Sequence, residues 1–163
     1  MPSEYQGKVV LVTGGSYGIG RAAAIGFARR GAKVAIADLD VKRGEETLQR
    51  IKEAGGDAIF VKTDVSSESD VKALVDKTVQ AAREHGATAI LVAGGVSANK
   101  PLREEMAKQA ELPVYTPPLH LCTDNAAMIA AAGTFRFQQG QRDDLAMDVQ
   151  PMWPIISLEA MAT

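Results

Sequence analysis

The chain has 163 residues, of which 46% are hydrophobic and 23% are charged, and its formal net charge is −2. This length fits one domain that buries roughly two-thirds of its unfolded surface, and the apolar runs are too short to span a bilayer. Residues 1–84 hold thirteen Lys and Arg against twelve Asp and Glu, and residues 85–163 hold five against eight. Neither half therefore predicts the basic face that nucleic-acid binding requires.

The single cysteine, Cys122, excludes an internal disulfide and agrees with a reducing compartment. The first residues do not follow the basic, apolar and small-residue order of a signal peptide. We therefore expect a cytoplasmic protein with no membrane partner and no nucleic-acid partner. The sequence leaves the oligomeric state open.

From Lys8 onward the pattern alternates between strands and helices. Short apolar runs, often β-branched, predict five strands, at residues 9–13, 34–38, 58–64, 89–93 and 114–116. Helical periodicity and helix-start signals predict helices in the intervals and after the fifth strand, at residues 21–30, 41–54 and 68–84, from about Pro101, and around residues 126–132.

The helix ends carry recognisable signals. Ser67 and Asp70 have the spacing of a capping box, and Gly55 follows the helix predicted at residues 41–54. Thr123 is predicted to cap the last helix, which is apolar nearly all round, as a buried helix requires.

This alternation predicts an α/β fold: a three-layer, Rossmann-like, doubly wound parallel sheet of five strands in the order 3-2-1-4-5. We expect one domain over residues 1–163. Pro151 and Pro154 flank Trp153, which predicts that residues 141–163 form an extended tail packed on that domain, with Trp153 as its anchor.

The first strand is followed by a glycine-rich turn, Thr13-Gly14-Gly15-Ser16-Tyr17-Gly18-Ile19-Gly20, which leads into a helix. A helix that starts here directs unpaired N–H groups and the positive end of its dipole at one spot, and the glycines let a diphosphate approach. Asp38 ends the second strand about twenty residues later, where a dinucleotide site needs a carboxylate for the ribose. The alternative is an ordinary strand-to-helix turn with no ligand.

Up to about Gln80 the chain resembles the classical short-chain dehydrogenase/reductase family. The resemblance rests on the glycine-rich turn, on Ala37-Asp38-Leu39-Asp40 and on Thr63-Asp64-Val65-Ser66. It implies an NAD site, because an aspartate at position 38 would repel the 2′-phosphate of NADP. The implied cofactor-binding residues are Gly14, Ser16, Gly18, Ile19 and Gly20 at the pyrophosphate, Asp38 at the ribose, and Asp64 and Val65 at the adenine.

The family's catalytic signature, a tyrosine followed four residues later by a lysine, is missing. At that spacing Tyr5, Tyr17 and Tyr115 are followed by valine, arginine and leucine. We therefore predict no catalytic residue for hydride transfer.

From about residue 81 the chain resembles the C-terminal part of the tRNA threonylcarbamoyladenosine transferase family, which has the actin-like ATPase fold. The resemblance rests on residues 91–99, on Leu102-Arg103, on residues 122–130 and on Val149-Gln150-Pro151 with Trp153-Pro154. It implies that Gly94, Gly95 and Asn99 contact a nucleotide-linked substrate, such as ATP or an adenylate, and that Asp124 is a metal ligand. The family's pair of metal-binding histidines is absent, since His85 and His120 are isolated, so we predict no metal site.

The two resemblances predict a recombined or de novo designed chimera, with a dehydrogenase-like half at residues 1–80, a transferase-like half at 81–140 and the tail. We expect the Gly14 turn and the Gly94-Gly95 turn to lie side by side at the carboxyl edge of the sheet. Three functions stay open: an inactive NAD-binding domain, a scaffold without a ligand, and an ATP-binding or adenylate-binding remnant. Asp124 and Gly94-Gly95 also have purely structural interpretations, and Cys122 is expected to be a small buried residue.

Overall fold

The computed structural model describes residues 4–142 and 144. The chain divides into two compact units, the first ending at Thr123 and the second beginning at Asp124. Most of the predicted tail, including Trp153, lies outside the described residues.

The first unit contains a five-stranded sheet with the order β3-β2-β1-β4-β5, which confirms the predicted topology. All neighbouring strands are parallel. The strands are β1 (Lys8–Thr13), β2 (Lys33–Asp38), β3 (Asp57–Lys62), β4 (Ala89–Ala93) and β5 (Val114–Tyr115). The edge strand β5 has only two residues.

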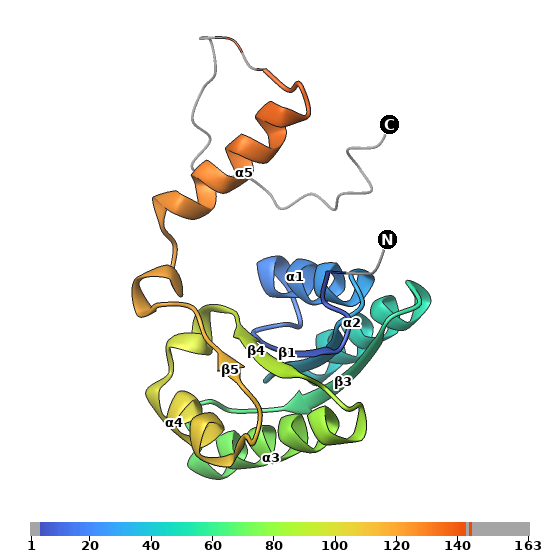
Figure 1. The fold of residues 1–163 in the computed structure, drawn as a ribbon, viewed down its shortest axis with the longest axis vertical. Helices are drawn as coiled ribbons and strands as arrows, with labels where there is room; N and C mark the ends of the chain where they lie inside the picture. Colours follow the sequence, from blue (N-terminus) through green and yellow to red (C-terminus); the bar gives the residue numbers. More distant parts are fainter. Residues whose placement is uncertain (1–3, 143, 145–163) are drawn as a thin grey trace. The chain divides into compact units, whose positions relative to one another are not determined.

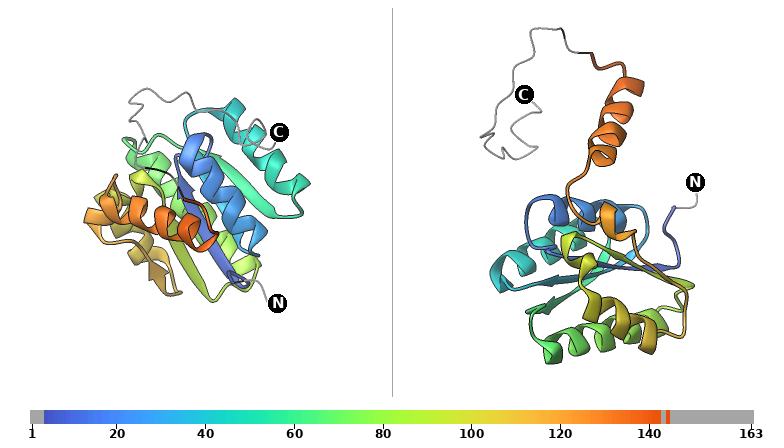
Figure 2. Two further views of the ribbon diagram at one scale, coloured as in Figure 1. Left: turned by 90° about the horizontal axis from the view of Figure 1, so that it is seen from above. Right: turned by 90° about the vertical axis from the view of Figure 1, so that its left-hand side faces the viewer.

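Helices cover both faces of this sheet, with α1 and α2 on one face and α3 and α4 on the other (Figures 1 and 2). The helices of the first unit are α1 (Gly18–Arg29), α2 (Val41–Glu53), α3 (Glu68–Glu84) and α4 (Lys100–Gln109), with the 3-10 turns η1 (Gly95–Ala98) and η2 (Leu119–Leu121). None of the described helices is long and apolar enough to cross a membrane.

The core is split between the two faces because successive residues of a strand point to opposite sides. In β1, Val9 and Leu11 pack with the residues of α3 and α4, whereas Val10 and Val12 pack with those of α1 and α2. All four are at most 1% exposed. Full burial of such side chains contributes about 1.5–3 kcal/mol each, so β1 is the central support of the unit.

Two of the predicted helix ends form as expected. Ser67 caps α3, and its hydroxyl accepts a hydrogen bond from the backbone N–H of Asp70. Gly55 follows α2 with a positive φ of 77°, and its N–H donates to the carbonyl of Lys52. The carboxylate of Asp70 accepts from the N–H of Asp64 at 3.0 Å, so the start of α3 also holds the loop after β3.

The second unit contains α5 (Ala126–Gln138), and the cap predicted for it was wrong. The side chain of Asn125 caps this helix by accepting from the N–H of Met128, in place of Thr123. Among the described residues of this unit, none of the residues of α5 is buried. Apolar residues are spread around this helix and are not gathered on one side, and Ile129, Phe135 and Phe137 are exposed.

Candidate functional site

The predicted binding residues of the first unit lie at the carboxyl edge of the sheet. Thr13 at the end of β1 is in register with Ala37 of β2, and Val12 is in register with Ala93 of β4. The segments that follow these strands are therefore neighbours. This is also the point where the strand order reverses, where open α/β sheets bind their ligands.

The glycine-rich turn is tied to the end of β2. The N–H groups of Gly14 and Gly15 both donate to the carbonyl of Ala37, at 2.8 and 3.4 Å. A Cβ atom on Gly20 would overlap the carbonyl group of Gly14. Glycine at position 20 thus lets the first turn of α1 lie directly against the loop.

Helix α1 presents uncapped N–H groups at this loop. It begins at Gly18, three residues earlier than predicted, and within the described residues no side chain caps it. The N–H groups of Gly18, Ile19 and Gly20 have no partner inside the helix, because the first helical bond joins the Arg21 N–H to the Tyr17 carbonyl. These groups and the helix dipole favour an anion.

Asp38 joins the end of β2 to the glycine-rich turn. Its Oδ2 accepts from the N–H of Ser16 and its Oδ1 from the N–H of Asp40, both at 3.1 Å. Partial burial raises the pKa of Asp38, but hydrogen bonds from the Ser16 hydroxyl and from backbone N–H groups, including those of Asp40 and Ser16, outweigh burial. The pKa is therefore held below its ordinary value, and Asp38 is an anion at neutral pH.

The loop after β3 brings Asp64 and Val65 to the same edge. The hydroxyl and the N–H of Ser66 bind the Asp64 carboxylate at 2.6 and 2.9 Å, and they hold the pKa of Asp64 below its ordinary value. The carbonyl of Val65 accepts from the side-chain amide of Asn99 at 3.3 Å. This bond links the loop after β3 to the start of α4.

The Gly94-Gly95 turn lies beside the Gly14 turn, as predicted. The Thr13 hydroxyl donates to the carbonyl of Ala93 at 3.1 Å. Gly94 has a φ of 99°, and a Cβ atom on it would overlap the carbonyl of Thr13. A close approach of two backbones thus explains glycine at position 94, while Gly95 is exposed and has open space around it.

Sequence reasoning missed the side chains that fix the glycine-rich turn. The Nε of Arg21 and the hydroxyl of Thr47 both donate to the carbonyl of Ser16, at 2.8 and 3.1 Å. The Arg43 guanidinium lies over the Tyr17 ring, 4.8 Å from its centroid. The spacing of these residues along the chain carried no signal, because the Thr47 and Arg43 contacts join α2 to the turn and the Arg21 contact joins α1 to it.

The other sequence candidates are scattered. His120 and Asp124 are exposed, and His85 ends α3. Among the described residues no group of three or more His, Cys, Asp or Glu could hold a metal ion. Cys122 is buried as predicted, but the guanidinium of Arg103 lies 3.1 Å from its sulfur atom, a contact that the sequence did not indicate.

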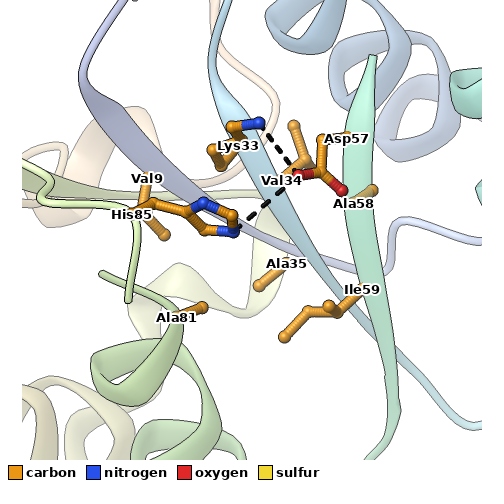
Figure 3. Close-up of a pocket in the computed structure, with 9 residues that line it drawn as sticks. All are labelled: Val9, Lys33, Val34, Ala35, Asp57, Ala58, Ile59, Ala81 and His85. Carbon is orange, nitrogen blue, oxygen red and sulfur yellow. Dashed lines mark hydrogen bonds and ion pairs between the residues drawn. The ribbon is translucent and has the colours of Figure 1, made fainter. Parts of the chain in front are cut away.

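A small indentation lies at the opposite, amino end of the strands (Figure 3). Asp57 accepts a hydrogen bond from Lys33 at 2.9 Å, and its Oδ2 lies 3.7 Å from the Nε2 of His85. The space of about 20 Å³ has room for about one water molecule. It is too small for a nucleotide.

A sequence profile of the short chain dehydrogenase family matches residues 8–114. These residues run from the first residue of β1 to the first residue of β5. The glucose dehydrogenase of Caenorhabditis elegans is 30% identical with a TM-score of 0.53, over 66% of this chain and 49% of that one. An NAD⁺-bound xylitol dehydrogenase is 23% identical with a TM-score of 0.57, over 84% and 66% of the two chains, and it supports the fold.

A second similarity is to another class of enzyme. The tRNA N6-adenosine threonylcarbamoyltransferase of Geobacillus thermodenitrificans is 53% identical over 93 residues, which are 55% of this chain and 27% of that enzyme. The chain therefore spans about a quarter of the length of this relative. Too few residues lie outside 8–114 to contain the alignment, so the two similarities overlap.

Proposed function

The chain belongs to the short chain dehydrogenase family, and from that membership we propose that its first unit binds NAD in preference to NADP and transfers no hydride. The residues present fit such a ligand. The carbonyl of Gly14 lies directly against Gly20, where a Cβ atom would overlap it, and the uncapped start of α1 lies beside this contact.

The observation that carries this proposal is the position of Asp38. Its carboxylate is anionic, ends β2 and contacts the glycine-rich turn through Ser16. A carboxylate at this point accepts hydrogen bonds from the two hydroxyls of an adenosine ribose, while the N–H groups of Gly18, Ile19 and Gly20 bind the pyrophosphate. Asp64 and Val65 then border the adenine.

Preference for NAD follows from charge. The 2′-phosphate of NADP would lie next to the Asp38 anion and would be repelled. Arg43 is the nearby cation that could offset this repulsion, but it forms an ion pair with Asp40 at 3.5 Å and lies over the ring of Tyr17. Its charge is therefore already partly compensated.

The absence of hydride transfer is proposed from the sequence. No tyrosine of the chain has a lysine four residues later, so a positioned proton donor with that pattern is missing.

We further propose that the chain is a chimera, natural or designed, of a dehydrogenase and a transferase. The two overlapping similarities support this origin. In the sheet β4 pairs with β1 in register from Lys8 to Val12. A strand that suits both parents allows one sheet to form from two sources.

Titration calorimetry of the purified chain with NADH, NADP⁺ and ATP tests the proposal. We expect saturable NADH binding at micromolar to sub-millimolar concentrations and weaker binding of NADP⁺. A cooperatively folded protein that binds none of the three would be a scaffold. In a separate assay, reduction of NAD⁺ by simple alcohols clearly above the buffer rate would contradict the proposal that the chain transfers no hydride.

ATP or adenylate binding at Gly94 and Gly95 is the second candidate, and the exposed, open position of Gly95 favours it. Asp38→Ala separates the two candidates. It should abolish NADH binding at the Gly14 turn but leave ATP binding at the Gly94 turn unchanged.

A further inference from the structure

The carboxyl edge of the sheet has two halves. The first consists of the segments after β1, β2 and β3, and the second consists of those after β4 and β5. A dinucleotide lies across both halves, with one nucleoside on each. If Asp38 holds the adenosine ribose and the start of α1 holds the pyrophosphate, the nicotinamide riboside must lie over the second half.

Polar side chains of the second half are already used within the chain. The Ser97 hydroxyl donates to the sulfur of Cys122 at 3.4 Å and is buried. The Asn99 amide caps α4 by accepting from the N–H of Leu102 at 2.9 Å, and it donates to the carbonyl of Val65. Both side chains are therefore occupied by contacts that hold η1 and α4 in place.

Arg103 is occupied in the same way. Its guanidinium donates to the carbonyl of Ser97, the hydroxyl of Thr116, the carbonyl of Pro117 and the sulfur of Cys122. Its Nε thus fastens η1 to α4, and its two terminal nitrogen atoms fasten the segment after β5 to α4.

Two further polar groups near this half are also placed unfavourably. The Thr13 hydroxyl donates to the carbonyl of Ala93. Tyr115 is exposed, but it is in register with Leu91, two residues before the end of β4. Within the described part of the first unit, the side chains of Ser97, Asn99 and Arg103 are thus already hydrogen-bonded inside the chain.

We propose that the chain recognises only the adenosine 5′-diphosphate portion of its ligand and does not distinguish NAD⁺, NADH and ADP-ribose. This inference rests on the proposed function and narrows its ligand class. A nicotinamide riboside that gains no hydrogen bond adds little binding free energy and loses freedom when ordered. The affinity is then set by Asp38 and the start of α1.

Titration calorimetry with NAD⁺, NADH, ADP-ribose and nicotinamide mononucleotide tests this inference. We expect the dissociation constants of NAD⁺, NADH and ADP-ribose to agree with one another within about threefold. We expect no saturable binding of nicotinamide mononucleotide. NAD⁺ binding more than about tenfold tighter than ADP-ribose, about 1.4 kcal/mol, would overturn the inference but leave the proposed function intact. Failure of all three adenosine ligands to bind would instead overturn the proposed function.

Two variants make the test specific to this chain. Asp38→Asn should weaken NAD⁺ and ADP-ribose by the same factor, because both present the same ribose to it. Ser97→Ala should change neither affinity, since the hydroxyl faces Cys122. A selective loss of NAD⁺ affinity in the Ser97 variant, with ADP-ribose binding unchanged, would show a nicotinamide subsite and overturn the inference.

Discussion

The Oδ2 atom of Asp38 lies 3.1 Å from the backbone nitrogen of Ser16 and accepts its hydrogen bond. The side chain proposed to bind the ribose therefore also holds the glycine-rich turn. Ser16 is buried, so loss of this acceptor would leave a buried N–H without its partner. Binding and local order are coupled at this contact.

Variants of Asp38 separate its charge from its hydrogen bond. Asp38→Ala should lower NAD affinity at least about tenfold and reduce the melting temperature, because both the ribose acceptor and the partner of Ser16 are lost. Asp38→Asn keeps an oxygen for Ser16 but removes the charge, so it should be more stable than the alanine variant and bind NADP relatively better. Calorimetry and thermal unfolding measure the two effects. Unchanged NAD affinity in Asp38→Ala would contradict the ribose assignment.

Arg21 positions the same turn from α1. Its Nε donates to the Ser16 carbonyl and lies 2.8 Å from the Thr47 hydroxyl. Arg21→Ala should lower the free energy of unfolding by about 1–3 kcal/mol and weaken NAD binding, because the buried Ser16 carbonyl loses a charged donor. Arg29→Ala, on the exposed end of the same helix, is the control and should change stability by less than about 0.5 kcal/mol. Urea unfolding measures the free energy of unfolding of both variants, and an equal loss in the two would contradict the role assigned to Arg21.

Two glycines of α1 give opposite predictions for the same substitution. A Cβ atom on Gly20 would overlap the Gly14 carbonyl, whereas a Cβ atom on Gly26 meets only the end of Arg30 at 3.9 Å. Gly20→Ala should destabilise the chain by about 1–3 kcal/mol and reduce NAD binding, because the turn must shift. Gly26→Ala should stabilise it by about 0.5–1 kcal/mol, because alanine is the better helix former. Chemical unfolding curves that coincide for the two variants would refute the close packing at Gly20.

The strand order and the position of the Gly14 turn were predictable because they depend on local signals. Continuous apolar runs mark β1 and β2, and parallel strands joined by helices restrict the topology. The helix cap at Asn125 was missed because Thr123, two residues earlier, is also a residue type that caps helices. The local sequence pattern does not distinguish Thr123 from Asn125, and it led to the wrong prediction.

The contacts that organise the site were not predictable in this way. Arg21 and Thr47 meet at Ser16, and Asn99 reaches Val65, across large separations in sequence. No periodicity encodes such contacts, since they arise only when the helices pack on the sheet.

The Asp57 carboxylate at the amino end of the sheet should make stability depend on pH (Figure 3). The hydrogen bond from Lys33 lowers its pKa, burial acts against this, and the charges of Lys33 and His85 lower it further, so the folded pKa is below the ordinary 3.8. A lowered pKa contributes stability above the unfolded pKa, and this contribution is lost as pH falls through the folded value.

Asp57→Asn should thus cost about 0.2–1 kcal/mol at pH 7, a small effect because both partners are about half exposed. Urea unfolding at pH 7 and near pH 3 measures the difference, which should shrink at the lower pH and in high salt. Asp76→Asn, an exposed carboxylate of α3, is the control, and an equal cost in both variants at pH 7 would mean that the Lys33 contact contributes nothing.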